Sequence, residues 1–536
     1  MLTFTLAVHR PRASDDPIAE ARVQRTRALA NWEPAYPEEN VGYYEEYIHR
    51  HASINVGWLD LPKAHTTDKE VFREATGVGT LTDNSTDSVS HVVAPLDDGS
   101  ICIWDVSGRT AADCGGSRGK LTCQSSPGLL TSRAPADTAE SHAIMTEIGA
   151  VECVSTDNNT NKAYFAVQSS LHEVDLNTLQ LTSTKQYPFP ITALSEAKDK
   201  TPVTIGTNWT IHLHDPRDPA FGTSNLTTEG ELIGGSIYSH ATLAQPGPLS
   251  ILHDRGLGTD DSSIWVAGRF TSLLNYDRRF FPRLVGTTFS GARIASLSSI
   301  PFPSRPRCLD LVRNPEASLS ALLEARSKPG ATIFAAAEYK GKGSLELYGL
   351  PDMHIYQNRQ TASASKLLSV ASHGGSIIFS DGDGNLKWVE RDGFSHVRTF
   401  NINETLPNSS EQDASAYGIW SSTASEMPGQ GDIVQKIIPT HPISSSSRST
   451  SEAREDINQS NLLLWTGDGR LGMLGFGHSN PLGEADEASE VQAGSAAQRA
   501  KEDAERQYGM AMRRALERNA DEVRFVRGLG MGYRRY

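Results

Sequence analysis

The chain has 536 residues and a formal net charge of −14, with 38% apolar and 21% charged residues. This length exceeds what one ordinary hydrophobic core organises, so we expect several domains or one large repeat architecture. The acidic balance argues against a general nucleic-acid-binding protein, which makes nucleic acid an unfavoured partner. No apolar run reaches the roughly 18 residues of a membrane-spanning helix, so the sequence predicts no membrane partner.

The cysteines and the N-terminus bear on the compartment. No CxxC spacing occurs, and the pattern therefore predicts neither a zinc site nor a disulfide framework. The first ten residues, MLTFTLAVHR, lack a basic region and a small-residue cleavage site, so they do not indicate a signal peptide. We expect an intracellular protein, cytoplasmic or nuclear. The five cysteines are Cys102, Cys114, Cys123, Cys153 and Cys308.

Residues 1–62 are interpreted as a flexible and helical N-terminal segment. A short helix is predicted over Ile18–Ala30, and a second helix is predicted to start at Pro37, which is followed by two glutamates. Four residues of the second helix fall on one side at helical spacing, namely Tyr44, Tyr47, Ile48 and His51. This stripe is expected to pack on the next domain, and the alternative is a helix that docks a partner.

Ser88–Gly108 is predicted to form two strands around the turn Asp97-Asp98-Gly99, because Asp-Gly between apolar runs favours a hairpin. The preceding residues, 63–87, are interpreted as a linker that becomes a first strand. The unit ends at Trp104-Asp105 and so resembles the WD-repeat family, in which this dipeptide ends the third strand of a propeller blade.

Weaker copies of this unit recur, each with an apolar strand, a Gly, Asp, Asn or Ser turn and a second strand. They are Lys162–Leu179, Pro202–Arg217, Ser262–Arg278, Ala331–Leu350, Ser376–Arg391 and Asn461–Gly477. The seven units predict an all-β, seven-bladed β-propeller over 63–480, closed by pairing of the first and last units, with a pair of β-sandwiches as the alternative. Large aromatic side chains in the units are expected to fill the space between blades; these are Trp104, Trp209, Trp265, Trp388 and Trp465.

Three stretches between the units are interpreted as inserts: Gly- and Ser-rich Ala111–Glu140, basic and aromatic Arg278–Arg307, and Ser-rich, disordered Thr440–Ser460. Residues 481–536 are predicted to form a helical, partly disordered C-terminal tail with a basic, aromatic end. Docking of this tail on the acidic propeller and contact with RNA or an acidic protein are both open.

No catalytic motif such as GxSxG, a P-loop or HExxH occurs, so we expect no catalytic residue, no metal and no cofactor. His212 and His214 lie two apart in a predicted strand and share a face, which could suit a metal, but we interpret them as surface or turn residues. The turn Asp381-Gly-Asp-Gly-Asn385 resembles the start of a calcium loop without its distal glutamate, and we interpret it as hairpin turn chemistry.

Three stretches resemble the F-box/WD-repeat-like proteins of filamentous fungi: NWEPAYPEENVGYYEEYIHRHASINVGWLDLP, SIWVAGRFTSLLNYDRRFFPRL and LLLWTGDGRLGMLGF. The resemblance implies an F-box that binds the Skp-type adaptor of a cullin–RING ubiquitin ligase, and a propeller that binds the substrate. Residues 1–30 contain no Leu-Pro followed by a Leu- and Ile-rich helix, as an F-box does. A truncated F-box and a propeller that never bound the adaptor are both open.

We therefore expect a non-enzymatic module that binds a protein partner or substrate, and the resemblance implies a relation to such ligases. The expected contact patch is basic and aromatic, because arginine and aromatic residues concentrate interface energy; it comprises Arg278, Arg279, Phe280, Phe281 and Arg283. The alternative for this run is an interblade loop held by buried aromatics. Two other functions stay open, a stand-alone scaffold whose basic tail contacts RNA or an acidic protein, and a propeller hydrolase with a site in the central channel.

Overall fold

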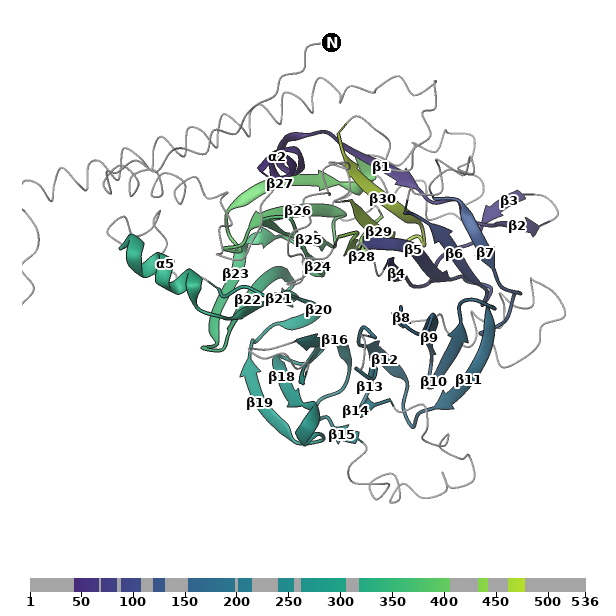
Figure 1. Ribbon diagram of the computed structural model, residues 1–536, viewed down its shortest axis with the longest axis horizontal. Helices are drawn as coiled ribbons and strands as arrows, with labels where there is room; N and C mark the ends of the chain where they lie inside the picture. The colour runs from purple at the N-terminus through teal and green to yellow at the C-terminus, as the bar shows by residue number, and fades with distance from the viewer. Residues whose placement is uncertain are drawn as a thin grey trace, which may run out of the picture.

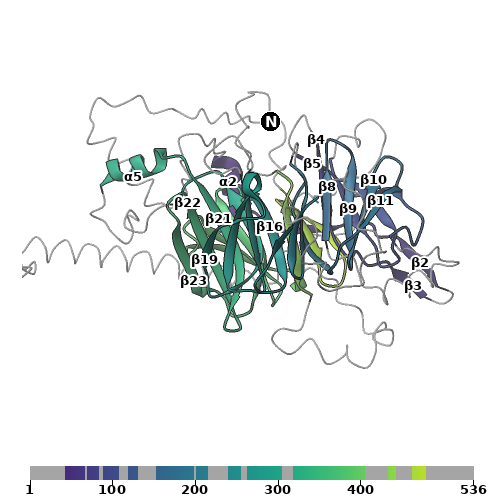
Figure 2. The ribbon, with the colours of Figure 1, turned by 90° about the horizontal axis from the view of Figure 1, so that it is seen from below.

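The protein folds as a seven-bladed β-propeller, which confirms the predicted fold class. The computed structural model describes residues 43–66, 69–83, 88–107, 119–130, 153–197, 201–214, 240–254, 262–304, 318–404, 432–441 and 461–477. Within these residues, seven antiparallel sheets of four strands each stand in a closed ring (Figure 1). Seen from the side, the strands run across the thickness of the ring (Figure 2).

Each blade runs from an inner strand near the ring axis to an outer strand at the rim. Blades 1 to 3 are β4 (Gly79–Asp83), β5 (Ser88–Pro95), β6 (Ile101–Asp105), β7 (Leu121–Gln124); β8 (Cys153–Asp157), β9 (Lys162–Val167), β10 (Ser170–Asp175), β11 (Gln180–Gln186); and β12 (Ile191–Leu194), β13 (Thr204–Thr207), β14 (Thr210–Leu213), β15 (His240–Thr242). Blades 4 and 5 are β16 (Pro248–Asp254), β17 (Ser263–Gly268), β18 (Ser272–Asp277), β19 (Leu284–Phe289); and β20 (Arg293–Ile300), β21 (Ala331–Tyr339), β22 (Lys342–Leu350), β23 (His354–Ser363). Blades 6 and 7 are β24 (Leu367–His373), β25 (Ser376–Asp381), β26 (Asn385–Glu390), β27 (His396–Asn401); and β28 (Val434–Pro439), β29 (Leu462–Thr466), β30 (Leu471–Phe476), β1 (Ile54–Trp58).

A few elements lie outside the blades. They are helix α2 (Tyr43–His51), the hairpin of β2 (Lys63–Thr66) and β3 (Lys69–Phe72), helix α5 (Leu319–Ser327), and the 3-10 turns η2 (Arg278–Phe280) and η4 (Ile402–Glu404). None of the helices in the described ranges is long and apolar enough to span a membrane. The predicted helix over Ile18–Ala30, the tail over 481–536 and most of Thr440–Ser460 lie outside the described residues.

All seven predicted hairpin units are confirmed, and each supplies the second and third strands of one blade. These two strands lie between the neighbouring blades, so both of their faces are covered and their sequences read as apolar runs. Seven hydrophobic clusters make up the core, and each joins residues of two adjacent blades. The core is therefore a ring of interblade contacts.

The ring is closed by β1, which pairs with β30 from Ile54↔Phe476 to Trp58↔Gly472. The expectation that the first and last units would pair with each other is wrong, because the closing strand comes from the segment 1–62. β1 has only a short alternation of apolar residues, and Ile54, Val56 and Trp58 pack partly buried against the cluster between blades 6 and 7. A strand of five residues whose partner lies far away in the sequence shows no hairpin with that partner.

Of the five tryptophans predicted to fill the space between blades, four lie in interblade clusters. Trp104, Trp265 and Trp388 are buried, and Trp465 packs partly buried against the cluster between blades 7 and 1. The prediction is wrong for Trp209, whose side chain is 43% exposed. It lies in the turn between β13 and β14, beyond the reach of the neighbouring blade's core.

Two of the predicted inserts also contain blade strands. The stretch Ala111–Glu140 includes β7, the outer strand of blade 1, and Leu130, which is buried in the cluster between blades 1 and 2. The stretch Arg278–Arg307 includes β19 and β20, the outer strand of blade 4 and the inner strand of blade 5. Interpretation of these stretches as inserts is wrong to that extent.

Helix α2 lies in the N-terminal segment, and its buried face differs in part from the predicted stripe. The buried side chains are Glu46 and His49, whereas Tyr47 is 56% exposed and its ring lies 4.8 Å from that of exposed His51. The side chain of Tyr44 lies outside the described part. Of the predicted stripe, Ile48 does pack partly buried against the cluster between blades 6 and 7, whereas Tyr47 and His51 are exposed. The contact with the propeller is therefore apolar at Ile48 and polar at Glu46 and Arg50.

Candidate protein-binding surface

Several blades share a bulge near the end of their third strand. In four blades, the pairing between the third and fourth strands shifts its register by one residue near the end of the third strand. The residue that follows the shift is Trp104, Val174, Tyr276 or Val389. All four are buried and pack against the preceding blade. Trp388, one position earlier, packs against the following blade. A bulge of this kind decides which neighbour a side chain meets.

The next residue is acidic in all four blades: Asp105, Asp175, Asp277 and Glu390. Each aspartate accepts a hydrogen bond from the backbone N–H two residues further on, at 2.8 to 2.9 Å. The carboxylate thereby caps the loop that leads to the outer strand. In blade 6 the longer Glu390 side chain reaches Arg50 of α2 instead, at 2.6 Å.

The blade-4 corner, residues Asp277–Arg283, contains all five predicted contact residues. Asp277 caps η2 through the N–H of Arg279 and also pairs with the Arg279 side chain, whose Nη2 lies 2.9 Å from Asp277 Oδ2. Hydrogen bonding from Arg279 lowers the pKa of Asp277. The corner is thus a fixed loop, and it holds Arg279 and Phe280 outward.

The five predicted residues divide into two groups. Arg279, Phe280 and Arg283 are exposed, with Phe280 exposed to 64%. Arg278 and Phe281 are half-buried: Arg278 Nη2 lies 3.3 Å from His253 Nε2, and the Phe281 ring lies 5.9 Å from that of Tyr276. The first group faces solvent, while the second attaches the corner to the blade.

Sequence reasoning missed the strand that follows the corner. Ten large apolar side chains are exposed in the described part of the chain, and four of them lie within ten residues, namely Phe280, Leu284, Val285 and Phe289. The last three belong to β19, which we call the blade-4 edge. The signal available in the sequence was the uncharged run LVGTTF directly after a basic run.

The concentration of apolar side chains on the blade-4 edge is a property of this blade. The outer strand β11 of blade 2 has the sequence QLTSTKQ and exposes one large apolar side chain, Leu181. The outer strand β23 of blade 5 exposes Ile355. Since these strands hold the same place in their blades, the fold itself does not require apolar residues at the rim.

The histidine pair is buried, so its interpretation as surface or turn residues is wrong. His212 and His214 do share a face, since both contact Tyr187: the His212 ring lies 5.1 Å from its ring, and His214 Nδ1 lies 3.1 Å from its hydroxyl oxygen. Burial lowers the pKa of His212 to about 3. Within the described ranges, no group of three or more His, Cys, Asp or Glu side chains is placed to hold a metal ion.

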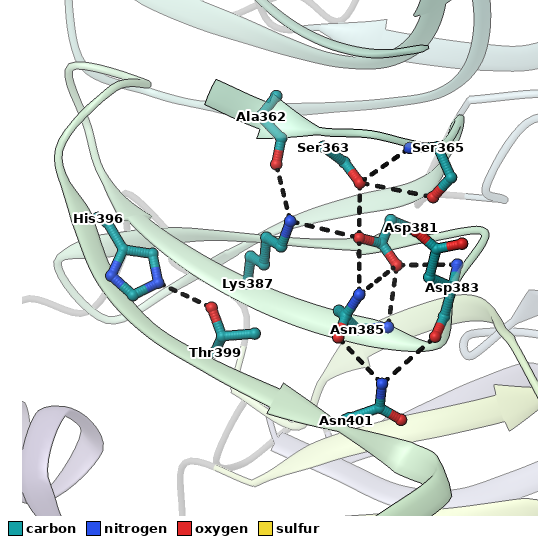
Figure 3. A network of polar contacts seen from close by, with 10 residues as sticks. All are labelled: Ala362, Ser363, Ser365, Asp381, Asp383, Asn385, Lys387, His396, Thr399 and Asn401. Carbon is teal, nitrogen blue, oxygen red and sulfur yellow. Dashed lines mark hydrogen bonds and ion pairs between the residues drawn. The ribbon is translucent and has the colours of Figure 1, made fainter. Parts of the chain in front are cut away.

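The Asp381 turn forms the hairpin predicted for it, between β25 and β26 (Figure 3). The buried Asp381 carboxylate accepts hydrogen bonds from the backbone N–H groups of Asp383 and Asn385 at 3.0 and 2.9 Å, and from Ser363 Oγ at 2.7 Å. Lys387 Nζ lies 3.4 Å from Asp381 Oδ2. Protein donors thus occupy the oxygens that a calcium ion would need, and the turn chemistry explains the residues.

A second buried carboxylate, Glu346 on β22, is also held by donors of the protein. It accepts hydrogen bonds from the hydroxyls of Ser290, Ser344 and Tyr348, and Arg359 Nη2 lies 2.9 Å from its Oε1. Burial and the Glu346 charge raise the pKa of Tyr348. A carboxylate that is fully bonded in this way stabilises the join between blades 4 and 5.

Comparison with known proteins adds no family assignment. No protein-family model matches the chain, and no curated protein matches it. The resemblance to WD-repeat and F-box proteins therefore rests on the motifs in the sequence alone.

Proposed function

We propose that this propeller is a non-enzymatic protein-interaction module whose binding surface consists of the blade-4 corner and the blade-4 edge. One observation carries the proposal: Phe280, Leu284, Val285 and Phe289 are exposed together, beside exposed Arg279 and Arg283. Exposed apolar groups that gather in one place mark interaction sites, and aromatic and arginine side chains dominate the energy of such sites.

Binding is proposed in preference to catalysis because of how the buried acids are used. The carboxylates of Glu346 and Asp381 take part in hydrogen bonds within and between blades. Groups that are bonded in this way contribute stability and are not set up to exchange protons with a substrate.

A role in a ubiquitin ligase is a finer proposal, which the resemblance motivates. In it, the blade-4 surface binds the substrate and an adaptor of the Skp type joins through the N-terminal segment. The proposal places the protein inside the cell, in the cytoplasm or the nucleus.

The test is affinity purification of the full chain from cells that express it, followed by mass spectrometry. The variant Arg279→Glu/Phe280→Ala/Arg283→Glu should lose a defined set of proteins that the wild type retains. The matched control Leu181→Lys, on the rim of blade 2, should retain that set. An unchanged set in the triple variant would refute the blade-4 surface, and absence of an adaptor and a cullin would refute the ligase role alone.

A further inference from the structure

The blade-4 edge is a strand with one side open. Sheet order places β19 at the rim of blade 4, and no other strand in the described part pairs with its outer side. The outer side of an edge strand presents unpaired N–H and C=O groups, which can pair with another chain.

Charge and proline, two features that commonly protect an edge strand, are missing here, and the one protective irregularity is the bulge at Val285. Residues 284–289, LVGTTF, include no charged residue and no proline. Val285, Thr287 and Phe289 are exposed at alternate positions and so line one face of the strand. At Gly286, midway along, a Cβ atom would meet nothing within 4 Å, so the sheet face at this position is open.

The charges beside this strand indicate what would cover it. Arg283 is exposed at the start of β19, and Arg279 is exposed to 63% although it pairs with Asp277. A second copy of the chain, pairing β19 with β19, would bring only further uncharged residues and arginines to these positions. An acidic partner segment would neutralise them.

We propose that a partner protein adds an extended segment to β19 as a fifth, antiparallel strand of blade 4. The segment carries apolar residues opposite Val285 and Phe289 and acidic residues at the end that faces Arg279 and Arg283. This inference rests on the proposed function and names the chemistry of its partner. Backbone hydrogen bonds supply affinity in such strand addition, and alternate side chains supply specificity.

The first test measures fluorescence anisotropy of a short labelled peptide with the full chain. The peptide has isoleucine at two positions four apart, threonines between and around them, and glutamates at its C-terminal end. Val285→Lys should weaken binding at least about tenfold, because it places a charge opposite an isoleucine of the peptide. Leu181→Lys should leave binding unchanged. The wild-type chain should not bind a scrambled control peptide. Val285 is 58% exposed, so its substitution spares the fold, and Thr287→Lys is a second variant of the same kind.

The second test separates strand addition from contact through side chains. Methylation of alternate backbone nitrogens removes N–H donors and keeps every side chain. Because alternate N–H groups point to opposite sides of a strand, one of the two methylated versions should bind about tenfold more weakly and the other should bind like the parent.

Three outcomes would overturn the inference: no binding of the parent peptide, equal binding of both methylated versions, or a dimer of the full chain that Val285→Lys dissociates. None of these would refute the proposed function, which fails only if the corner variant keeps all the partners of the wild type.

Discussion

Blades 4 and 6 have the same corner after their third strand, and they use it in opposite ways. In blade 6, Glu390 holds Arg50 of α2, and the helix covers the corner. In blade 4, the equivalent Asp277 caps its own loop and leaves Phe280 exposed. The acidic side chains of the two corners differ by one methylene group, and one corner binds a segment of its own chain whereas the other stays open.

The contact of α2 with blade 6 contains ion pairs and hydrogen bonds beside the packing of Ile48. Arg50 pairs with both Glu46 and Glu390, and Glu46 accepts a hydrogen bond from the backbone N–H of Gly375 at 2.9 Å. Arg398 donates to the backbone oxygens of His49 and Ala52. Such a contact depends on complete pairing, because a buried charge that loses its partner is costly.

The largest effect is expected from Arg50→Met, which keeps the length of the side chain and removes its charge. Glu46 and Glu390 would then face each other without a cation, and the free energy that holds α2 on blade 6 should fall by about 3 kcal/mol. Hydrogen exchange of residues 43–52 would measure this as lost protection. Retained protection would show that α2 is held by its packing alone.

The substitution Glu390→Asp tests whether side-chain length decides the use of the corner. The shorter carboxylate should withdraw from Arg50 and cap its own loop, as Asp277 does. Loss of a charge-assisted hydrogen bond should weaken docking of α2 by about 1.5 kcal/mol. Hydrogen exchange of the same residues would report it, and equal protection in both proteins would contradict the equivalence of the two corners.

Docking of α2 should also depend on pH through His49. Burial, together with the charges of His373 and Arg398, lowers the pKa of His49 to about 2. Since a free histidine titrates near pH ~6.5, the detached helix takes up a proton below that pH and the docked helix does not. His49 therefore stabilises docking fully above pH ~6.5, and this contribution falls by about 1.4 kcal/mol for each pH unit below it.

Glu390 acts in the opposite direction, because burial raises its pKa. The measurement is therefore the difference in helix protection between the wild type and His49→Gln across pH 4.5 to 7.5, in which the part due to Glu390 cancels. A difference that does not change with pH would refute the prediction.

The smallest effect is expected at the blade-4 corner. Arg279→Met breaks an ion pair in which the Arg279 side chain is 63% exposed, and exposed pairs contribute only about 0 to 1 kcal/mol. The melting temperature of the full chain should change by less than that of Arg50→Met, while loss of bound partner should be measurable. A large loss of stability would mean that the corner serves the fold.

Sequence alone determined the seven central hairpins, because their strands are covered on both faces and their turns need Gly, Asp or Asn. Gly384, for example, has a φ of +77° in the turn after Asp381. The sequence also indicated the basic, aromatic blade-4 corner, because a run of arginine and phenylalanine is visible without knowledge of packing.

Only the tertiary structure decided the rim and the closure of the ring. The outer strand β11 is polar and exposed along nearly its whole length, and β1 meets its partner β30 more than 400 residues away in the chain. It also decided that Trp209 lies exposed and that Val389, not Trp388, is equivalent to Trp104. A one-residue bulge or a distant strand pairing leaves no periodic trace in a sequence, because its cause lies in neighbours that folding brings together.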